Sequence, residues 1–131
     1  MTELKELIQT ADWKTEKHVP AIDAPDKIKK GEPVKITITV GKEIPHPNTT
    51  EHHISWAALY FHPDGEKFPC QIGRFDFGSH GESVQGPNTS TIYTDPEATC
   101  TLKTEKSGTL LAVSYCNIHG LWQSSKRIEV G

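Results

Sequence analysis

Apolar and polar residues alternate strictly between positions 34 and 40, and this alternation constrains the fold more than any other stretch of the chain. The apolar members are Val34, Ile36, Ile38 and Val40, and the polar members are Lys35, Thr37 and Thr39. Successive side chains of a β-strand point to opposite faces of a sheet. A period of two therefore predicts a strand with one buried face and one solvated face.

Further segments rich in β-branched and aromatic residues predict additional strands, with turn signals between them. These segments are residues 53–61, 68–77, 90–94, 98–104, 109–116 and 121–130. Pro63-Asp64-Gly65 predicts a hairpin turn, and Gly73 a bulge in the following strand. The only helical pattern is short, at residues 4–10, while residues 27–32 indicate a turn and Pro20 and Pro25 favour extended or looped backbone. Such a chain is predicted to be all-β, an antiparallel β-sandwich of about seven strands with a short N-terminal helix.

Length and charge exclude several classes of protein. A chain of 131 residues predicts a single domain over residues 1–131. A net charge of −3 argues against nucleic-acid binding, and no apolar run is long enough for a membrane span. Met1 is followed by polar residues and not by a signal peptide, so we expect a cytoplasmic protein.

The three cysteines Cys70, Cys100 and Cys116 form an odd number, which favours metal or thiol chemistry over a disulfide framework in a cytoplasmic chain. A bridge between Cys70 and Cys100 stays open at this point. Cys116 is the informative one, because it ends an apolar segment and precedes Asn117-Ile118-His119-Gly120. A thiolate and an imidazole at the end of a strand can bind one metal ion, and Gly120 lets the backbone bend back.

Other histidines are spaced so that they can join this pair. His46 and His52 stand at the two ends of a short loop stiffened by Pro47, and His18 lies in an extended segment near the N-terminus. His52 and His53 are neighbours that enter a strand, so their side chains point to opposite faces and only one can join a given site. The candidate donors are His18, His46, His52, His119 and Cys116.

Four nitrogen donors and one sulfur donor are one too many for the tetrahedral site that structural zinc prefers. Imidazole with one thiolate suits iron or copper. Four imidazoles in a plane with a thiolate on one side would leave the opposite position open to a small ligand. A thiolate in that place pushes electron density toward the open side, as in haem proteins with a cysteine ligand.

Two other functions compete with a catalytic iron site. A cupredoxin-like copper electron carrier is also a β-sandwich with a late Cys-x-x-His, but such proteins need a soft axial ligand, and the only methionine is Met1. That interpretation leaves His18 and one histidine of the loop pair unexplained. A non-catalytic module with structural zinc does not explain five donors. Taken singly, each histidine is more often an ordinary polar residue than a ligand.

Three motifs resemble the superoxide reductases of the neelaredoxin type, the short form of the desulfoferrodoxin family with a single iron centre. They are Glu16-Lys17-His18-Val19-Pro20, His46-Pro47-Asn48 through Glu51-His52-His53-Ile54, and Cys116-Asn117-Ile118-His119-Gly120. They occur in the family's order across most of the chain. The long form carries a further cysteine-rich region before these motifs, whereas here no cysteine precedes Cys70.

The resemblance implies one mononuclear non-haem iron per chain, with His18, His46, His52 and His119 in a plane and Cys116 as axial ligand. Glu16 would occupy the sixth position in the oxidised protein, and Lys17 would be the cation beside the open face. The implied fold is an immunoglobulin-like sandwich, assembled into a homotetramer. The implied reaction is the one-electron reduction of superoxide to hydrogen peroxide, with iron re-reduced by a rubredoxin-like donor.

Overall fold

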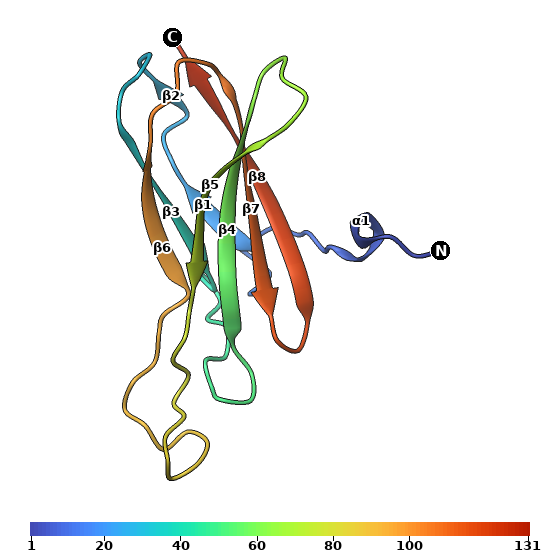
Figure 1. Ribbon diagram of the computed structural model, residues 1–131, viewed down its shortest axis with the longest axis vertical. Helices are drawn as coiled ribbons and strands as arrows, with labels where there is room; N and C mark the ends of the chain where they lie inside the picture. Colours follow the sequence, from blue (N-terminus) through green and yellow to red (C-terminus); the bar gives the residue numbers. More distant parts are fainter.

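Two β-sheets packed face to face form the body of the protein in the computed structural model, which describes residues 1–131 (Figure 1). One sheet has the order β1-β3-β6 and the other the order β2-β8-β7-β4-β5. The first sheet comprises β1 (Pro20–Asp23), β3 (Val34–Val40) and β6 (Glu97–Leu102). The second comprises β2 (Lys27–Ile28), β4 (Ile54–Pro63), β5 (Cys70–Asp76), β7 (Gly108–Cys116) and β8 (Gly120–Val130). The predicted all-β sandwich is confirmed, with eight strands.

The core lies between the two sheets and is formed by the apolar faces that the sequence pattern predicts. Val34, Ile36, Ile38 and Val40 of β3 are all buried, while Lys35 between them is exposed. They pack in one cluster with residues of the opposite sheet that include Ala57, Leu59, Phe61, Leu110 and Ile128. Burial of these side chains is the main force that holds the two layers together.

Several elements differ from the sequence prediction. β1 and β2 are strands that the sequence pattern does not predict. β1 pairs antiparallel with β3, and β2 pairs with β8 as the one parallel pair among the eight strands. Residues 90–94 are not a strand; they belong to the long β5–β6 connection, where His80 and Tyr93 form an isolated bridge. The predicted irregularity at Gly73 is real, because the β4–β5 register passes from Leu59–Gly73 to Tyr60–Gln71 and leaves one residue unpaired.

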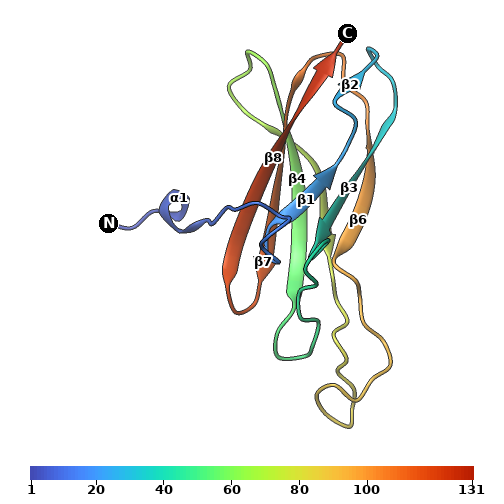
Figure 2. The ribbon, with the colours of Figure 1, turned by 180° about the vertical axis from the view of Figure 1, so that it is seen from behind.

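The N-terminal residues form an arm that projects sideways from the sandwich (Figures 1 and 2). Its helix α1 (Leu4–Leu7) is shorter than the predicted 4–10 and has no buried residue. Beyond the helix, Gln9 pairs with Trp122 at the edge of β8. No helix of this structure has the length and apolar character needed to cross a membrane.

One end of the sandwich carries three connections that matter for the site. They are the β3–β4 loop, the long β5–β6 connection that extends beyond the sheets, and the tight β7–β8 turn (Figure 1). The segment that leads into β1 reaches the same end, because β1 runs antiparallel to β3. All the histidines of the three sequence motifs lie on these segments.

Candidate metal centre

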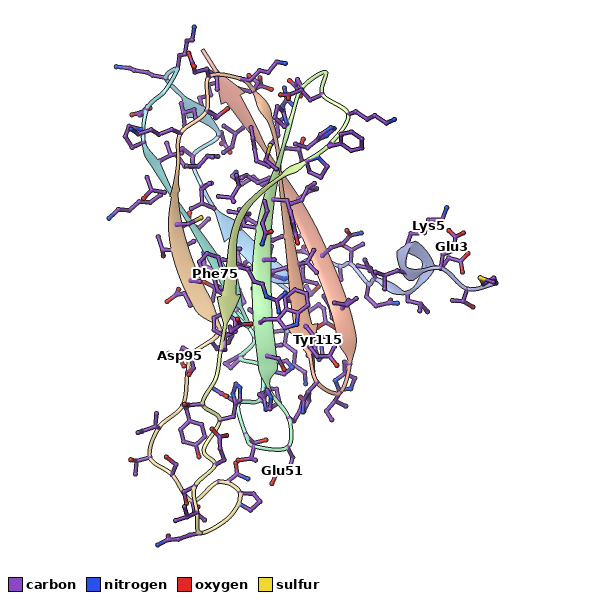
Figure 3. The ribbon with its side chains drawn as sticks, viewed as in Figure 1. Glu3, Lys5, Glu51, Phe75, Asp95 and Tyr115 are labelled. Atoms are coloured by element: carbon purple, nitrogen blue, oxygen red, sulfur yellow. The ribbon has the colours of Figure 1, made fainter.

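The predicted donors come from three separate parts of the chain that meet at this end of the sandwich. His18 lies just before β1, and His46 and His52 lie in the β3–β4 loop. Cys116 is the last residue of β7, and His119 lies in the β7–β8 turn. Figure 3 shows Glu51 of the β3–β4 loop and Tyr115 near the end of β7 at the same end of the fold. The strand pair β4–β7 brings these loops together, since Ile54 is paired with Cys116.

The β7–β8 turn is built to aim two donors at one point. Cys116 pairs with Gly120 across a three-residue loop, and Gly120 has a φ of 80°, which favours glycine. The Cys116 side chain is 1% exposed, and its Sγ accepts a hydrogen bond from the backbone N–H of His119 at 3.3 Å. The predicted role of Gly120 in bending the chain is confirmed.

His18 is held by contacts on both its backbone and its ring. The buried Ser114 hydroxyl of β7 donates to the His18 carbonyl at 3.0 Å. The ring of Trp122 stacks on the His18 ring with centroids 4.9 Å apart, and its Nε1–H donates to the His119 carbonyl at 3.2 Å. These contacts join the N-terminal segment to β7 and β8, so His18 is fixed although it lies outside any strand.

Four imidazoles form a ring around a common centre in the order His18, His46, His52, His119. Neighbouring ring centroids are 4.7, 4.7, 5.1 and 4.7 Å apart, taken in turn around the ring. The His18 and His52 centroids, across the ring, are 6.4 Å apart. Four near-equal sides and a longer diagonal describe a square arrangement of imidazoles.

The hydrogen bonds of the histidines show which nitrogens face inward. Nδ1–H of His18 donates to Glu16 Oε1 at 2.7 Å, and Nδ1–H of His46 donates to the Pro47 carbonyl at 2.6 Å. Nε2 of these two rings is therefore the free nitrogen. His18 Nε2 lies 3.1 Å from His119 Nδ1, and His46 Nε2 lies 3.5 Å from Cys116 Sγ.

His52 supplies the clearest evidence that the site fits a cation. Its Nε2 is the one buried side-chain nitrogen or oxygen in the structure without a hydrogen-bond partner. Donor atoms of His18, His52, Cys116 and His119 all lie within 4.8 Å of one another. A buried polar atom without a partner is costly, so this donor set fits a bound cation.

Burial also favours the protonation state that a metal requires. It lowers the pKa of His46 to about 4, with smaller contributions from the charges of His18, His52 and Lys17. Burial likewise lowers the pKa of His52, with help from the charges of His119, His18 and Lys17. Both imidazoles are therefore neutral near pH 7, as metal ligands must be.

Glu16 and Lys17 occupy different positions relative to the donors. The Glu16 carboxylate lies against His18, accepting hydrogen bonds from its backbone N–H at 2.6 Å and from its ring. Neither Glu16 nor His46 is among the four residues whose donor atoms lie within 4.8 Å of one another. His46 adjoins them through its Nε2, which lies 3.5 Å from Cys116 Sγ. Partial burial raises the pKa of Glu16, but the His18 hydrogen bonds outweigh it and the net pKa is lowered. Lys17 is half-buried, and its charge acts on both His46 and His52.

The remaining cysteines and histidines lie outside the cluster. Cys70 and Cys100 are both free, so no bridge joins them. His53 faces away from the cluster, as predicted; its ring stacks on His80 with centroids 3.5 Å apart, and its Nδ1–H donates to the Thr49 carbonyl. The sequence alone indicated no role for Ser114, Trp122, Asn88 or Asn117.

Comparison with known proteins places the chain in a family. Residues 10–125 match the model of the desulfoferrodoxin family. The chain belongs to the desulfoferrodoxin family. This membership confirms the resemblance found in the sequence motifs.

The relatives within the desulfoferrodoxin family cover nearly the whole length of the chain. The superoxide reductase of Pyrococcus furiosus is 57% identical over 126 residues, which are 96% of this chain and 99% of the relative. The neelaredoxin of Megalodesulfovibrio gigas is 52% identical over 125 residues, 95% of this chain and 96% of the relative. The solved structure of the superoxide reductase (neelaredoxin) of Archaeoglobus fulgidus in the reduced form superposes with a TM-score of 0.88 at 57% identity, and the match covers 95% of this chain and 99% of that one.

The cupredoxin-like alternative is wrong. This member of the desulfoferrodoxin family brings four imidazoles around Cys116, whereas a blue-copper site uses two histidines and one cysteine. The copper interpretation leaves His18 and one histidine of the loop pair unexplained, whereas in the structure His18, His46 and His52 all belong to the ring.

Proposed function

We propose that the protein is a superoxide reductase that holds one mononuclear non-haem iron through His18, His46, His52, His119 and Cys116. The observation that carries this proposal is the square of four imidazoles beside the buried thiol, with His52 Nε2 left without a protein partner. The names of the family relatives support it. When bound, iron would supply the electron that reduces superoxide and would regain one from an external donor.

The donor set fits iron better than zinc. Five donors exceed the four that zinc takes in structural sites, and a mixture of imidazole with a single thiolate suits a redox metal. The outward ring N–H groups donate to fixed acceptors, Nδ1–H of His18 to the Glu16 carboxylate and Nδ1–H of His46 to the Pro47 carbonyl. These bonds fix which nitrogen of each ring is presented to the ion. The N–H of His119 on Cys116 Sγ stabilises the thiolate.

Lys17 is proposed to attract superoxide and to stabilise the charge that develops on the way to peroxide. Superoxide is a small anion, and a half-buried cation beside the site concentrates it and lowers its energy there. The reaction is balanced, because one superoxide, one electron and two protons give one hydrogen peroxide. Glu16 is proposed as the sixth ligand of the oxidised protein, a role that requires its carboxylate to leave the hydrogen bonds with His18.

We further propose a rubredoxin-like electron donor, a cytoplasmic location and a homotetramer. The N-terminal arm supports assembly, because Leu4 and Leu7 are 58% and 57% exposed on a helix that buries none of its own side chains. A four-residue helix is too short to be stable unless it packs on a neighbour. Sedimentation equilibrium should give four times the mass of one chain, and a monomer would refute the tetramer.

The decisive experiment combines metal analysis with product analysis. Purified protein should contain about one iron per chain, and its oxidised form should show a visible thiolate-to-iron charge-transfer band that disappears in Cys116→Ser. With superoxide and a reductant it should form peroxide without releasing oxygen. Stoichiometric oxygen release would indicate a dismutase, and zinc or copper in place of iron would refute the proposal.

A further inference from the structure

The side chain of Asn117 binds both peptide groups that flank His52. Its Oδ1 accepts a hydrogen bond from the His53 N–H at 2.9 Å, and its Nδ2 donates to the Glu51 carbonyl at 2.8 Å. The Asn117 backbone N–H also donates to the His53 carbonyl at 3.2 Å. One amide thus fixes the peptide on either side of a single histidine.

Asn88 holds the same loop from the long β5–β6 connection. Its Oδ1 accepts from the Thr50 N–H at 2.9 Å, and its Nδ2 donates to the Glu51 carboxylate at 2.8 Å. Asn88 is the one non-glycine residue with positive φ, at 57°. This backbone conformation costs free energy in residues other than glycine, although asparagine tolerates it best. The hydrogen bonds of the Asn88 side chain to the β3–β4 loop are a physical reason to retain this backbone conformation.

We propose that Asn117 and Asn88 are positioning residues that clamp the β3–β4 loop and so set where His52 Nε2 points. The side-chain bonds of Asn117 anchor the peptide groups on both sides of His52 and so restrict its φ and ψ, which leaves the imidazole little freedom beyond its own rotamer. A third bond, from the Thr49 N–H to the His52 carbonyl at 2.9 Å, completes this restraint. Asn88 restrains the two residues just before His52.

The clamp also joins the two ligand loops to each other. Asn117 stands between Cys116 and His119, so its bonds fix the position of His52 relative to those two donors. Loss of the amide should therefore change metal binding more than it changes the fold. This inference rests on the proposed iron site.

The test compares Asn117→Ala and Asn88→Gly with the control Thr89→Ala. Glycine at position 88 keeps the positive φ and removes only the side chain. The hydroxyl of Thr89 binds Gly86 and Ser83 within its own turn and does not reach the β3–β4 loop. Loss of a partner outside the first coordination shell weakens metal binding by about 10- to 100-fold, so we expect that loss of Fe²⁺ affinity in Asn117→Ala.

Competition with a chelator measures the Fe²⁺ and Co²⁺ affinities of the wild type and of each variant. In Asn117→Ala the charge-transfer band of the oxidised iron form should also shift. Asn88→Gly should show a smaller loss in the same direction, and Thr89→Ala none. Wild-type affinity and spectrum in both asparagine variants would overturn the clamp. If Asn117→Ala does not fold, Asn88→Gly alone decides in the same way.

Hydrogen exchange in the metal-free protein separates the clamp from the proposed function. The His53 amide should exchange faster in Asn117→Ala than in wild type, because Asn117 Oδ1 is its acceptor. If the wild-type protein proves to bind no iron, the proposed reductase is refuted. Faster exchange of the His53 amide in Asn117→Ala would still support the clamp in that case. Unchanged exchange would refute the clamp whatever the metal content.

Discussion

Lys17 lies half-buried next to the histidines. Burial is the main cause that lowers the pKa values of His46 and His52, and the charge of Lys17 adds a small contribution to both. Lys17→Ala should slow the reaction with superoxide by roughly tenfold at low salt, because the steering charge is lost. The dependence of the rate on ionic strength should weaken as well. Pulse radiolysis at several salt concentrations measures both effects.

Lys35 provides the matched control for this prediction. It is an exposed lysine on the outer face of β3, away from the donor cluster, and Lys35→Ala removes the same net charge. The rate at which Lys35→Ala reacts with superoxide should stay at the wild-type level. Equal slowing in the two variants would show that the rate depends on the net charge of the protein and not on the position of Lys17.

His80 is buried against His53, and it links protein stability to pH. Burial lowers its pKa from the ordinary value of 6.5, and the charge of His53 adds to this, while a backbone hydrogen bond and Glu82 oppose it. Below pH 6.5 the unfolded chain therefore binds a proton at His80 before the folded chain does. The free energy of unfolding should fall as pH decreases through this window.

Urea unfolding of the metal-free protein between about pH 7.5 and pH 5 measures this slope. His80→Gln should show a smaller slope than wild type. Poorer packing around glutamine lowers the free energy of unfolding equally at every pH, so it does not affect the comparison of slopes. Identical slopes would remove His80 from the acid sensitivity of the fold.

Imidazole and thiolate are chemically distinctive, so residue types and spacing singled out five side chains that the structure places next to one another. Their role as metal ligands stays a prediction. Residue types and spacing did not place the Glu16 carboxylate on His18, since a glutamate next to a lysine is equally consistent with a solvated charge pair. Asn117 and Ser114 could not be predicted either. Their roles depend on which backbone groups lie opposite them, and that is decided by the pairing of distant strands.

At the scale of elements, Gly41 directly follows β3 and is the first residue of the loop that carries His46. Its φ is 82°, and a Cβ at this position would lie 2.6 Å from the His46 backbone nitrogen. Gly41→Ala should therefore lower stability by about 1–2 kcal/mol through the left-handed backbone and should also displace His46. We expect a loss of iron affinity in chelator competition.

Gly31 separates these two effects. It also has a positive φ, 71°, but a Cβ there would meet nothing within 4 Å. Gly31→Ala should show the loss of stability with unchanged iron affinity. If both variants bind iron as wild type does, the contact with His46 has no part in forming the site.

The sequence predicts most clearly the strands whose own residues show that one or both faces are buried. β3 alternates cleanly, and β7 is a continuous apolar run, so both are evident from residue types. β1 and β2 are short and lie around Pro20 and Pro25, and they form because neighbouring strands supply their hydrogen bonds. Residues 90–94 have strand-forming composition but no partner strand, and they remain in the β5–β6 connection.

At the scale of the whole molecule, the donor segments come from the start, the middle and the end of the chain. We expect residues 1–131 to unfold as one domain in a single transition that shifts when iron is removed. At a free iron concentration about 100 times the Kd, binding adds about 2.7 kcal/mol, which corresponds to roughly 10 °C in Tm for a chain of this size.

Calorimetry before and after dialysis against a chelator measures this shift. Cys116→Ser should show a smaller one, because the serine hydroxyl is a poor replacement for the thiolate. An unchanged Tm in wild-type protein that has demonstrably lost its iron would show that the ion does not tie the three segments together.

The wide separation of the donors has a consequence for how the protein is made. His18 leaves the ribosome early, but its ring neighbour His119 follows 101 residues later, and β8 must be complete before it can pair with β7. A nascent chain therefore presents three imidazoles without a thiolate and cannot assemble the cluster. The full set of five proposed donors can come together only once β8 has left the ribosome, so a shorter nascent chain does not form the complete site.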